Sequence, residues 1–271
     1  MSPVDAVAPA ATAPAAPVPW ARAQAAALTV YAAGSLRAVL GEIVADFEAR
    51  PDGVPVRLVF GAAGLLKERL LAGEAADLFA SANLEHPQAL LACGRAESVR
   101  PFARNALCAL ASPSFALQGR GLIERLLDER VKLGTSTPES DPSGDYAFEM
   151  FERAEACGDA PPGGAARLKA KALQLTGGPG SPPPPRDRNV YGALVADGHA
   201  DVFITYRTNA AIVRREQPQL QVLPLPERAN VCATYGLAVL KGASPQARRF
   251  ADALLGEAGQ RRLSAHGFAA A

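Results

Sequence analysis

The sequence contains few of the residues that mark several large protein classes. Its 271 residues include one tryptophan, three histidines and four cysteines, and 28 lysines and arginines face 27 acidic residues. Four cysteines are too few for a disulfide scaffold. A net charge of +1 argues against nucleic acid or an anionic membrane as the main partner, because both bind most strongly to proteins with clustered positive charge. With 49% hydrophobic residues, the composition instead indicates a globular protein with a sizeable core.

Long apolar runs are also missing, since no stretch reaches the roughly 18 consecutive apolar residues of a membrane-spanning helix. Residues 1–27 are mostly alanine, proline and valine, and their only charges are Asp5 and Arg22. Prolines interrupt this segment and no basic residue precedes it, unlike a secretory signal. We expect a disordered leader here, either a remnant of an export signal or an Ala/Pro tail without function.

Strand-like and helix-like segments alternate from Leu28 onward. Apolar runs at 28–32, 54–60 and 76–80 are each followed by a helical spacing of apolar residues, and a second series follows residue 107. This alternation predicts an α/β fold with a parallel sheet covered by helices. Two long apolar strands near Leu107 and Val231 would join two lobes, formed by residues 28–107 plus 232–271 and by residues 108–231. A ligand cleft is expected between them.

Small residues stand at four turns that each open a predicted helix. A helix start exposes unpaired N–H groups and about half a positive charge, so several such turns meeting in a cleft can bind an oxyanion without a cation. In an α/β sheet, these turns lie at the carboxyl ends of strands, where ligands bind. The turns are Gly34-Ser35-Leu36, Gly61-Ala62-Ala63-Gly64, Pro142-Ser143-Gly144 and Asn189-Val190-Tyr191.

Several blocks of the chain resemble the periplasmic molybdate-binding proteins of ABC importers. They include Val30-Tyr31-Ala32-Ala33-Gly34-Ser35-Leu36, the run 72–82, Asp141-Pro142-Ser143-Gly144, the run 189–194, the run 200–206 and the final Gly267-Phe268. The resemblance covers about residues 28–268. It implies a two-lobed type II periplasmic-binding-protein fold with two crossing hinge strands. It also implies that the protein captures molybdate or tungstate in the cleft and delivers it to a membrane permease.

The resemblance also implies which residues hold the oxyanion. Ser35 matches the serine of the first turn, Ser143 falls at the third turn, Val190 matches the fourth, and Tyr206 matches the tyrosine that contacts the ligand. The second turn departs from the pattern, because Ala63 stands where a serine is usual. Only backbone N–H groups of Ala63 and Gly64 would then face the ligand. We expect a periplasmic monomer without a cofactor. We also expect no side chains that ligate a metal ion, because the protein would contact molybdate or tungstate through the oxygen atoms of the anion.

Other readings of the site stay open. An arginine in the cleft, Arg104 or Arg207, would suit an organic carboxylate or another oxyanion. An intracellular ligand-sensing module is a further alternative, because the leader is an unconvincing signal. An enzyme is not expected, because the histidines have no zinc-type spacing and neither a nucleophile elbow nor a phosphate loop occurs.

Two further expectations concern acidic and sulfur-containing residues. Glu139, Asp141 and Asp145 form an acidic cluster beside Ser143, and we expect them to face away from the cleft because they would repel an oxyanion. Cys108 and Cys232 lie in the two predicted crossing strands, so they are candidates for a disulfide, although free thiols are the expected state.

Overall fold

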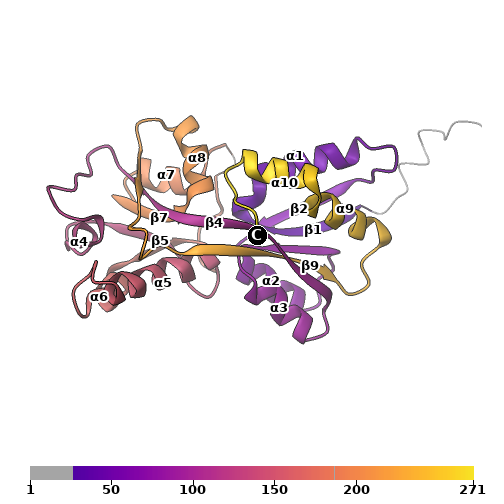
Figure 1. Cartoon of the computed structure of the whole chain (residues 1–271), viewed down its shortest axis with the longest axis horizontal. Helices are drawn as coiled ribbons and strands as arrows, with labels where there is room; N and C mark the ends of the chain where they lie inside the picture. Colours follow the sequence, from indigo (N-terminus) through magenta and orange to yellow (C-terminus); the bar gives the residue numbers. More distant parts are fainter. Residues whose placement is uncertain (1–26, 186) are drawn as a thin grey trace, which may run out of the picture.

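The computed structural model describes residues 27–185 and 187–271, so the predicted leader at residues 1–27 lies outside the described residues except for its last position. Two α/β lobes lie side by side and are joined by the long strands β4 and β9 (Figure 1). Across both described stretches, the helices are all too short or too polar to cross a bilayer.

Lobe 1 is built on strands in the order β2-β1-β3-β9-β4. Strand β1 pairs in parallel with β2 and β3, and β9 runs antiparallel to β3. All six residues of β1 are buried, because helices cover both faces of this sheet (Figure 1). The elements of lobe 1 are β1 (Leu28–Ala33), the 3-10 turn η2 (Gly34–Leu36), α1 (Arg37–Glu48), β2 (Val56–Gly61), α2 (Ala63–Leu71), β3 (Leu78–Ser81), α3 (Glu85–Ala92), β9 (Cys232–Leu240), α9 (Pro245–Leu255) and α10 (Glu257–Ala265), together with the first part of β4 (Ala96–Ala111).

Lobe 2 continues the sheet in the order β4-β7-β5-β6, and β8 pairs with β4. Strand β5 is parallel to β6 and β7, whereas β7 is antiparallel to β4. The remaining elements of lobe 2 are α4 (Leu122–Leu126), β5 (Leu133–Ser136), α5 (Pro142–Ala156), α6 (Gly164–Lys171), β6 (Leu173–Thr176), α7 (Val190–Ala196), β7 (Val202–Tyr206), α8 (Arg207–Glu216) and β8 (Gln221–Pro224).

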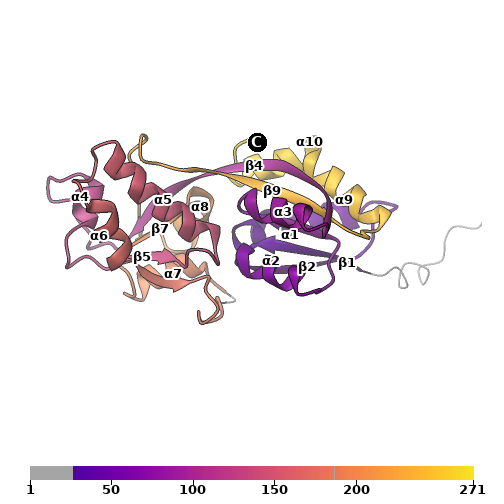
Figure 2. The same ribbon diagram turned by 90° about the horizontal axis from the view of Figure 1, so that it is seen from below.

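Strand β4 belongs to both sheets. It pairs with β9 from Ala96 to Ala106, and from Leu107 onward it pairs with β7 and β8. Both strands run from one lobe into the other in the perpendicular view (Figure 2). We keep the predicted lobe limits at residues 107–108 and 231–232 as a proposal, which this change of pairing partner supports.

The chain returns to lobe 1 after β9 and ends at the junction of the lobes. Helix α9 packs against the first helix of the lobe, where the rings of Phe47 and Phe250 meet edge to face with centroids 5.2 Å apart. Beyond α10, Arg104 of β4 and Ala269 exchange two backbone hydrogen bonds. The carboxyl terminus therefore lies against a crossing strand (Figure 1).

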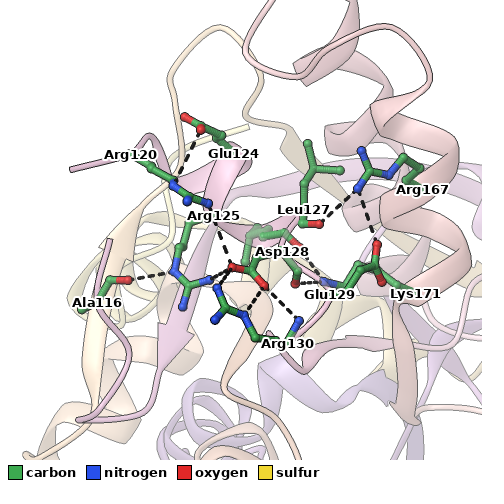
Figure 3. A network of polar contacts seen from close by, with 11 residues as sticks. Ala116, Arg120, Glu124, Arg125, Leu127, Asp128, Glu129, Arg130, Arg167 and Lys171 are labelled. Atoms are coloured by element: carbon green, nitrogen blue, oxygen red, sulfur yellow. Dashed lines mark hydrogen bonds and ion pairs between the residues drawn. The ribbon is translucent and has the colours of Figure 1, made fainter. Parts of the chain in front are cut away.

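The outer end of lobe 2 carries a dense ionic network around α4. The carboxylate of Asp128 binds Arg125 at 2.9 Å and Arg130 at 2.8 Å (Figure 3). Lys171 of α6 donates to the backbone carbonyl of Leu126 at 2.8 Å. Hydrogen bonds from Arg130 hold the pKa of the Asp128 carboxyl well below its usual range. Lys171 thus fastens α6 to α4, and within residues 27–185 and 187–271 each of the cations Arg125, Arg130 and Lys171 has a carboxylate or carbonyl partner.

Candidate functional site

The two lobes meet directly at the start of α2. The Gly64 amide donates to the Ser140 carbonyl oxygen at 2.9 Å, and a Cβ atom on Gly64 would lie 2.5 Å from the carbonyl oxygens of Glu139 and Ser140. Glycine is therefore required for this approach. Glu139 has a φ of 65°, and its amide donates to Asp145 Oδ1 at 2.7 Å. The loop before α5 is thus held against lobe 1.

Four polar side chains form a hydrogen-bonded series at the crossing strands. Ser35 Oγ lies 2.9 Å from the hydroxyl oxygen of Tyr235 in β9. Asn105 Nδ2 in β4 donates to that same hydroxyl oxygen at 3.3 Å and to Thr208 Oγ1 in α8 at 2.8 Å. The first turn of lobe 1 is therefore connected to the first turn of α8 in lobe 2 through both hinge strands.

The chemistry of this series sets the direction of one of its hydrogen bonds. The Asn105 amide nitrogen can only donate, so the Tyr235 oxygen accepts from it. Between Ser35 and Tyr235 either hydroxyl can be the donor. When Tyr235 donates to Ser35 Oγ, the Ser35 proton is free for another acceptor, such as an oxygen of an oxyanion.

Two other predicted ligand-binding side chains are buried without a partner. The hydroxyls of Ser143, at the start of α5, and of Tyr206, at the end of β7, have no hydrogen-bond partner of standard geometry within the described residues, although the Tyr206 hydroxyl is near enough to that of Tyr235 to lower its pKa. Ser143 is 0% exposed and Tyr206 is 1% exposed. An unsatisfied buried hydroxyl costs about 1 to 3 kcal/mol, so such groups call for a ligand or an ordered water.

Four of the five tyrosines of the chain influence one another at this place. Burial raises the pKa of Tyr206 well above its usual value, and the charges of Tyr235, Asp141, Tyr146 and Tyr191 add to the rise. The rings of Tyr206 and Tyr235 lie with centroids 5.8 Å apart. The hydroxyls of these tyrosines therefore stay protonated and can act as donors at any physiological pH.

The backbone positions predicted to bind the ligand differ in their availability. Ala63 is buried as the first residue of α2, but the amide of the next residue, Gly64, is already bonded to Ser140. Val190 is the first residue of α7, whose N-cap Asn189 accepts from the amides of Tyr191 and Gly192. The amides that remain for a ligand are therefore those of the first residues of these helices.

Sequence reasoning missed Asn105, Tyr146 and Tyr235 as parts of this cluster, and it named Tyr191 only as part of the fourth turn. The expectation that Asp141 faces away from the cleft stays a prediction. The Asp141 carboxylate caps α5 by accepting the Ser143 amide N–H at 3.1 Å. An aspartate followed by proline is a usual start of a helix.

The two arginines named as alternative ligand-binding residues are placed less favourably. Arg104 and Arg207 are both exposed, and the described residues contain no ion pair for either of them. Cys232 lies opposite Ala106 and Cys108 lies opposite Thr205, so the two thiols are not register neighbours, and both are free. In the described parts of the chain, no group of three or more His, Cys, Asp or Glu side chains is placed to hold a metal ion.

A surface cavity of about 640 Å³ lies at the opposite end of lobe 1. It is lined by Thr29, Asp77, Arg95 and Lys241, where β1 and β3 begin and β9 ends. None of its lining side chains is a buried polar group without a partner. The unpaired hydroxyls therefore point to the interlobe cluster as the candidate binding site.

Comparison with known proteins gives a family and two relatives. Residues 28–269 match the family described as Bacterial extracellular solute-binding protein. An uncharacterized protein of Pasteurella multocida is 37% identical over 201 residues, which cover 74% of this chain and 80% of the relative. The molybdate-binding protein ModA of Mycobacterium bovis is 28% identical over 264 residues, which cover 96% of this chain and 89% of that protein.

Solved structures agree with the fold. The sulfate-binding protein SubI from Mycobacterium tuberculosis has a TM-score of 0.74 at 18% identity, with coverage of 90% of this chain and 86% of that one. The periplasmic molybdate-binding protein of Azotobacter vinelandii has a TM-score of 0.66 at 16% identity, covering 90% and 99%. L-phospholactate-bound PEB3, a protein of Campylobacter jejuni, has a TM-score of 0.66 at 16% identity, covering 89% and 98%. The predicted type II fold is confirmed by these structures.

Proposed function

We propose, from the premise that this chain belongs to the bacterial extracellular solute-binding protein family, that it captures molybdate or tungstate between its lobes and delivers it to a membrane permease. The family is one of binding proteins, as expected for a chain without catalytic motifs. Its extracellular description also speaks against the intracellular sensing alternative.

One observation carries the proposal: the hydroxyls of Ser143 and Tyr206 are both buried and unpaired. Ser143 belongs to the first turn of the 15-residue helix α5, whose unpaired amides and positive dipole end favour an anion. Ser35, which is free to donate when the Tyr235 hydroxyl donates to it, would add a hydroxyl from lobe 1. An oxyanion with four oxygens can accept from donors of both lobes at once.

Binding would be coupled to hinge motion. Donors from both lobes reach one anion only when the lobes are closed, so the ligand binds the closed form more tightly and shifts the population toward it. The hydrogen bond from Gly64 to Ser140 would further stabilise the closed form, because its two partners belong to different lobes. A closed, loaded protein is the form that a permease would receive.

The names of one relative and of two proteins with similar structures describe the binding of related anions. ModA of Mycobacterium bovis is a molybdate-binding protein, and the similarity extends over 96% of the present chain. SubI is a sulfate-binding protein, and PEB3 was solved with L-phospholactate. All three names describe small anions with a tetrahedral oxyanion or phosphate group, which is the ligand class that we propose here.

Isothermal titration of the purified chain with molybdate, tungstate, sulfate and phosphate tests the proposal. We expect molybdate and tungstate to bind more tightly than sulfate; the three anions share charge and shape, so selectivity would come from the size of the closed cleft. Ser143→Ala is expected to weaken binding ten- to hundredfold, since a hydrogen bond to a charged ligand contributes about 1.5 to 3 kcal/mol. Ser114→Ala, at an exposed position of lobe 2, is the matched control. No heat with any of the four anions would reject the proposal.

A phosphorylated or carboxylated organic anion is the second candidate. It is favoured by Ala63, which supplies no hydroxyl at the second turn, and by the tyrosine-lined surroundings of Tyr206. This candidate predicts weak molybdate binding by the wild type and tight binding by Ala63→Ser. Strong molybdate binding that Ala63→Ser leaves unchanged would remove it.

A further inference from the structure

Helix α10 ends in a glycine turn that fixes the direction of the chain at Phe268. Gly267 has a φ of 87°, which glycine adopts without strain, and its amide donates to the Ser264 carbonyl oxygen at 2.9 Å. The Phe268 amide donates to the Leu263 carbonyl oxygen at 3.1 Å. These two hydrogen bonds form a Schellman motif, in which the chain turns away from the helix directly after the glycine. The helix end itself therefore determines where Phe268 lies.

Contacts with α1 and β4 attach this helix end to lobe 1. Arg262 of α10 binds Asp46 of α1 at 2.9 Å. Arg104 of β4 and Ala269 exchange backbone hydrogen bonds of 2.8 and 2.9 Å. Residues 267–269, which we call the strap, therefore lie along β4 just before that strand changes its pairing partner from β9 to β7, close to the chain end marked C in Figure 1.

Phe268 is the buried residue of the strap. Its side chain is 5% exposed, whereas the residues on either side of it are exposed. Its phenyl ring meets the ring of Tyr235 edge to face, with centroids 5.4 Å apart and an interplanar angle of 83°. The rings of Phe102 and Tyr206 lie further from that of Tyr235, with centroid distances of 6.1 and 5.8 Å. Since Tyr235 is 0% exposed, packing against such neighbours sets the position of its ring.

Tyr235 connects the strap to the ligand-binding side chains. Its hydroxyl oxygen lies 2.9 Å from Ser35 Oγ and accepts from Asn105 Nδ2 at 3.3 Å. The oxygen is attached rigidly to the ring, so a tilt of the ring displaces it relative to both partners. Hydrogen bonds weaken steeply when their geometry departs from the preferred values. The packing of Phe268 against Tyr235 therefore affects the contact between Tyr235 and Ser35.

The strap also lies close to lobe 2. The Cβ position at Gly267 is 3.9 Å from Cγ2 of Thr208, in the first turn of α8. Thr208 Oγ1 accepts the second hydrogen bond from the Asn105 amide, at 2.8 Å. The strap is thus next to both ends of the hydrogen-bonded series that joins the lobes.

We propose that Phe268 is a positioning residue of the ligand site, which holds the Tyr235 ring so that its hydroxyl group contacts Ser35. The inference rests on the proposed function, because the site that Phe268 serves is the interlobe cluster. A smaller side chain at this position leaves a cavity beside the Tyr235 ring. The ring then tilts into the cavity, and Ser35 loses the partner that leaves its proton free for the anion.

Titration calorimetry with molybdate and with phosphate tests the effect on affinity. Phe268→Leu is expected to weaken anion binding about five- to tenfold, the size expected for one weakened hydrogen bond. In a Tyr235→Phe background the same change should alter the affinity less than about twofold, because the hydroxyl group that Phe268 positions is absent. An equal loss of affinity in both backgrounds would overturn the inference.

Phe250→Leu is the matched control for packing alone. Phe250 is also fully buried in lobe 1, and its ring makes an edge-to-face contact with Phe47. Both leucine variants should lose stability in urea unfolding, but only Phe268→Leu should lose affinity. The same loss of affinity in Phe250→Leu would show a general effect of core packing and would overturn the inference.

A crystal structure of ligand-free Phe268→Leu tests the positioning without any anion. The Tyr235 hydroxyl oxygen should lie beyond hydrogen-bond distance of Ser35 Oγ, whereas the two atoms are 2.9 Å apart with Phe268 in place. A Tyr235 hydroxyl group that still contacts Ser35 would overturn the inference. Wild-type protein that binds none of the four anions would instead reject the proposed function, and the distance in the variant would still decide whether Phe268 positions Tyr235.

Discussion

The hydroxyl groups of Ser35 and Tyr235 lie 2.9 Å apart although 200 positions separate the two residues. The first belongs to the turn after β1 and the second to a strand that crosses between the lobes. Their contact explains how a hinge strand can control a ligand-binding side chain, because the Tyr235 hydroxyl decides whether the Ser35 proton is free.

Replacing Tyr235 with phenylalanine tests this control. In Tyr235→Phe the Ser35 hydroxyl loses its partner and can turn its proton elsewhere, so we expect about tenfold weaker oxyanion binding, or about 1.4 kcal/mol. Isothermal titration measures the change. Tyr31→Phe is the matched control, since the Tyr31 hydroxyl bonds to Glu74, outside the site. Equal loss of affinity in both variants would contradict the role of Tyr235.

Replacing Tyr206 tests whether its hydroxyl group contributes to ligand binding or to stability. Its hydroxyl is buried without a partner, so Tyr206→Phe removes an unsatisfied group and should leave the free energy of unfolding unchanged or slightly higher. The same change removes a donor for the oxyanion and should weaken binding ten- to hundredfold. Urea unfolding and titration calorimetry measure the two effects. A clear loss of stability together with unchanged affinity would show that the hydroxyl is a structural group.

Much of the fold could be predicted from the sequence, because apolar runs and small-residue turns mark most strands and helix starts. The first half of β4 could not, since Glu97, Arg100 and Pro101 make it polar and a bulge follows the proline. Helix α8 was also missed: it begins at Arg207 directly after a strand, with no glycine or proline between them. The helical spacing of apolar residues over 245–266 predicts one helix, but the structure divides it at Gly256 into α9 and α10.

The residues themselves indicated the site only at the turns, and Tyr206, the last residue of β7, was named from the family resemblance alone. Ser35 and Ser143 occur at helix starts, which a spacing pattern can locate. Asn105 and Tyr235 lie within strands, and nothing in their neighbourhood in the sequence indicates that they meet. Their contact depends on the register between β4 and β9, which pairs Asn105 with Ala233 and Ala103 with Tyr235. Long-range pairing of this kind is a property of the folded sheet.

The thiols should differ sharply in reactivity. Burial raises the pKa of the Cys108 thiol to about 12, whereas Cys93 and Cys232 are exposed. Since the thiolate is the reactive form, we expect a disulfide reagent at pH 8 to label Cys93 and Cys232 rapidly and Cys108 only after unfolding. Mass analysis of labelled peptides provides the measurement. A bridge between Cys108 and Cys232 in air-oxidised protein would contradict the exposure and register of the two residues.

His86 should make the protein less stable in mild acid. Burial, and secondarily the charge of Lys67, lowers the pKa of His86 from 6.5 to about 4. The unfolded chain therefore binds a proton here below pH 6.5 that the folded chain does not, so stability present above pH 6.5 is lost as the pH falls toward 4. In urea unfolding at pH 7.5 and pH 5, His86→Gln should lose less stability than the wild type. His199→Gln, at an exposed position, should behave like the wild type, and equal losses in all three would refute the assignment.

Gly64 provides a test of lobe closure, because any side chain at this position collides with the opposite lobe. A Cβ atom there would lie 2.5 Å from the carbonyl oxygens of Glu139 and Ser140, and backbone atoms cannot move aside as a flexible side chain would. In Gly64→Ala we therefore expect the open form to dominate, with a larger radius of gyration in X-ray scattering and oxyanion affinity reduced at least tenfold. Gly41→Ala is the matched control: Gly41 lies on the exposed face of α1 with nothing within 4 Å of its Cβ position. Alanine there should raise the free energy of unfolding by roughly 0.5 to 1 kcal/mol and leave the shape unchanged. If Gly64→Ala scatters and binds as the wild type does, contact between the lobes at this turn does not limit ligand capture.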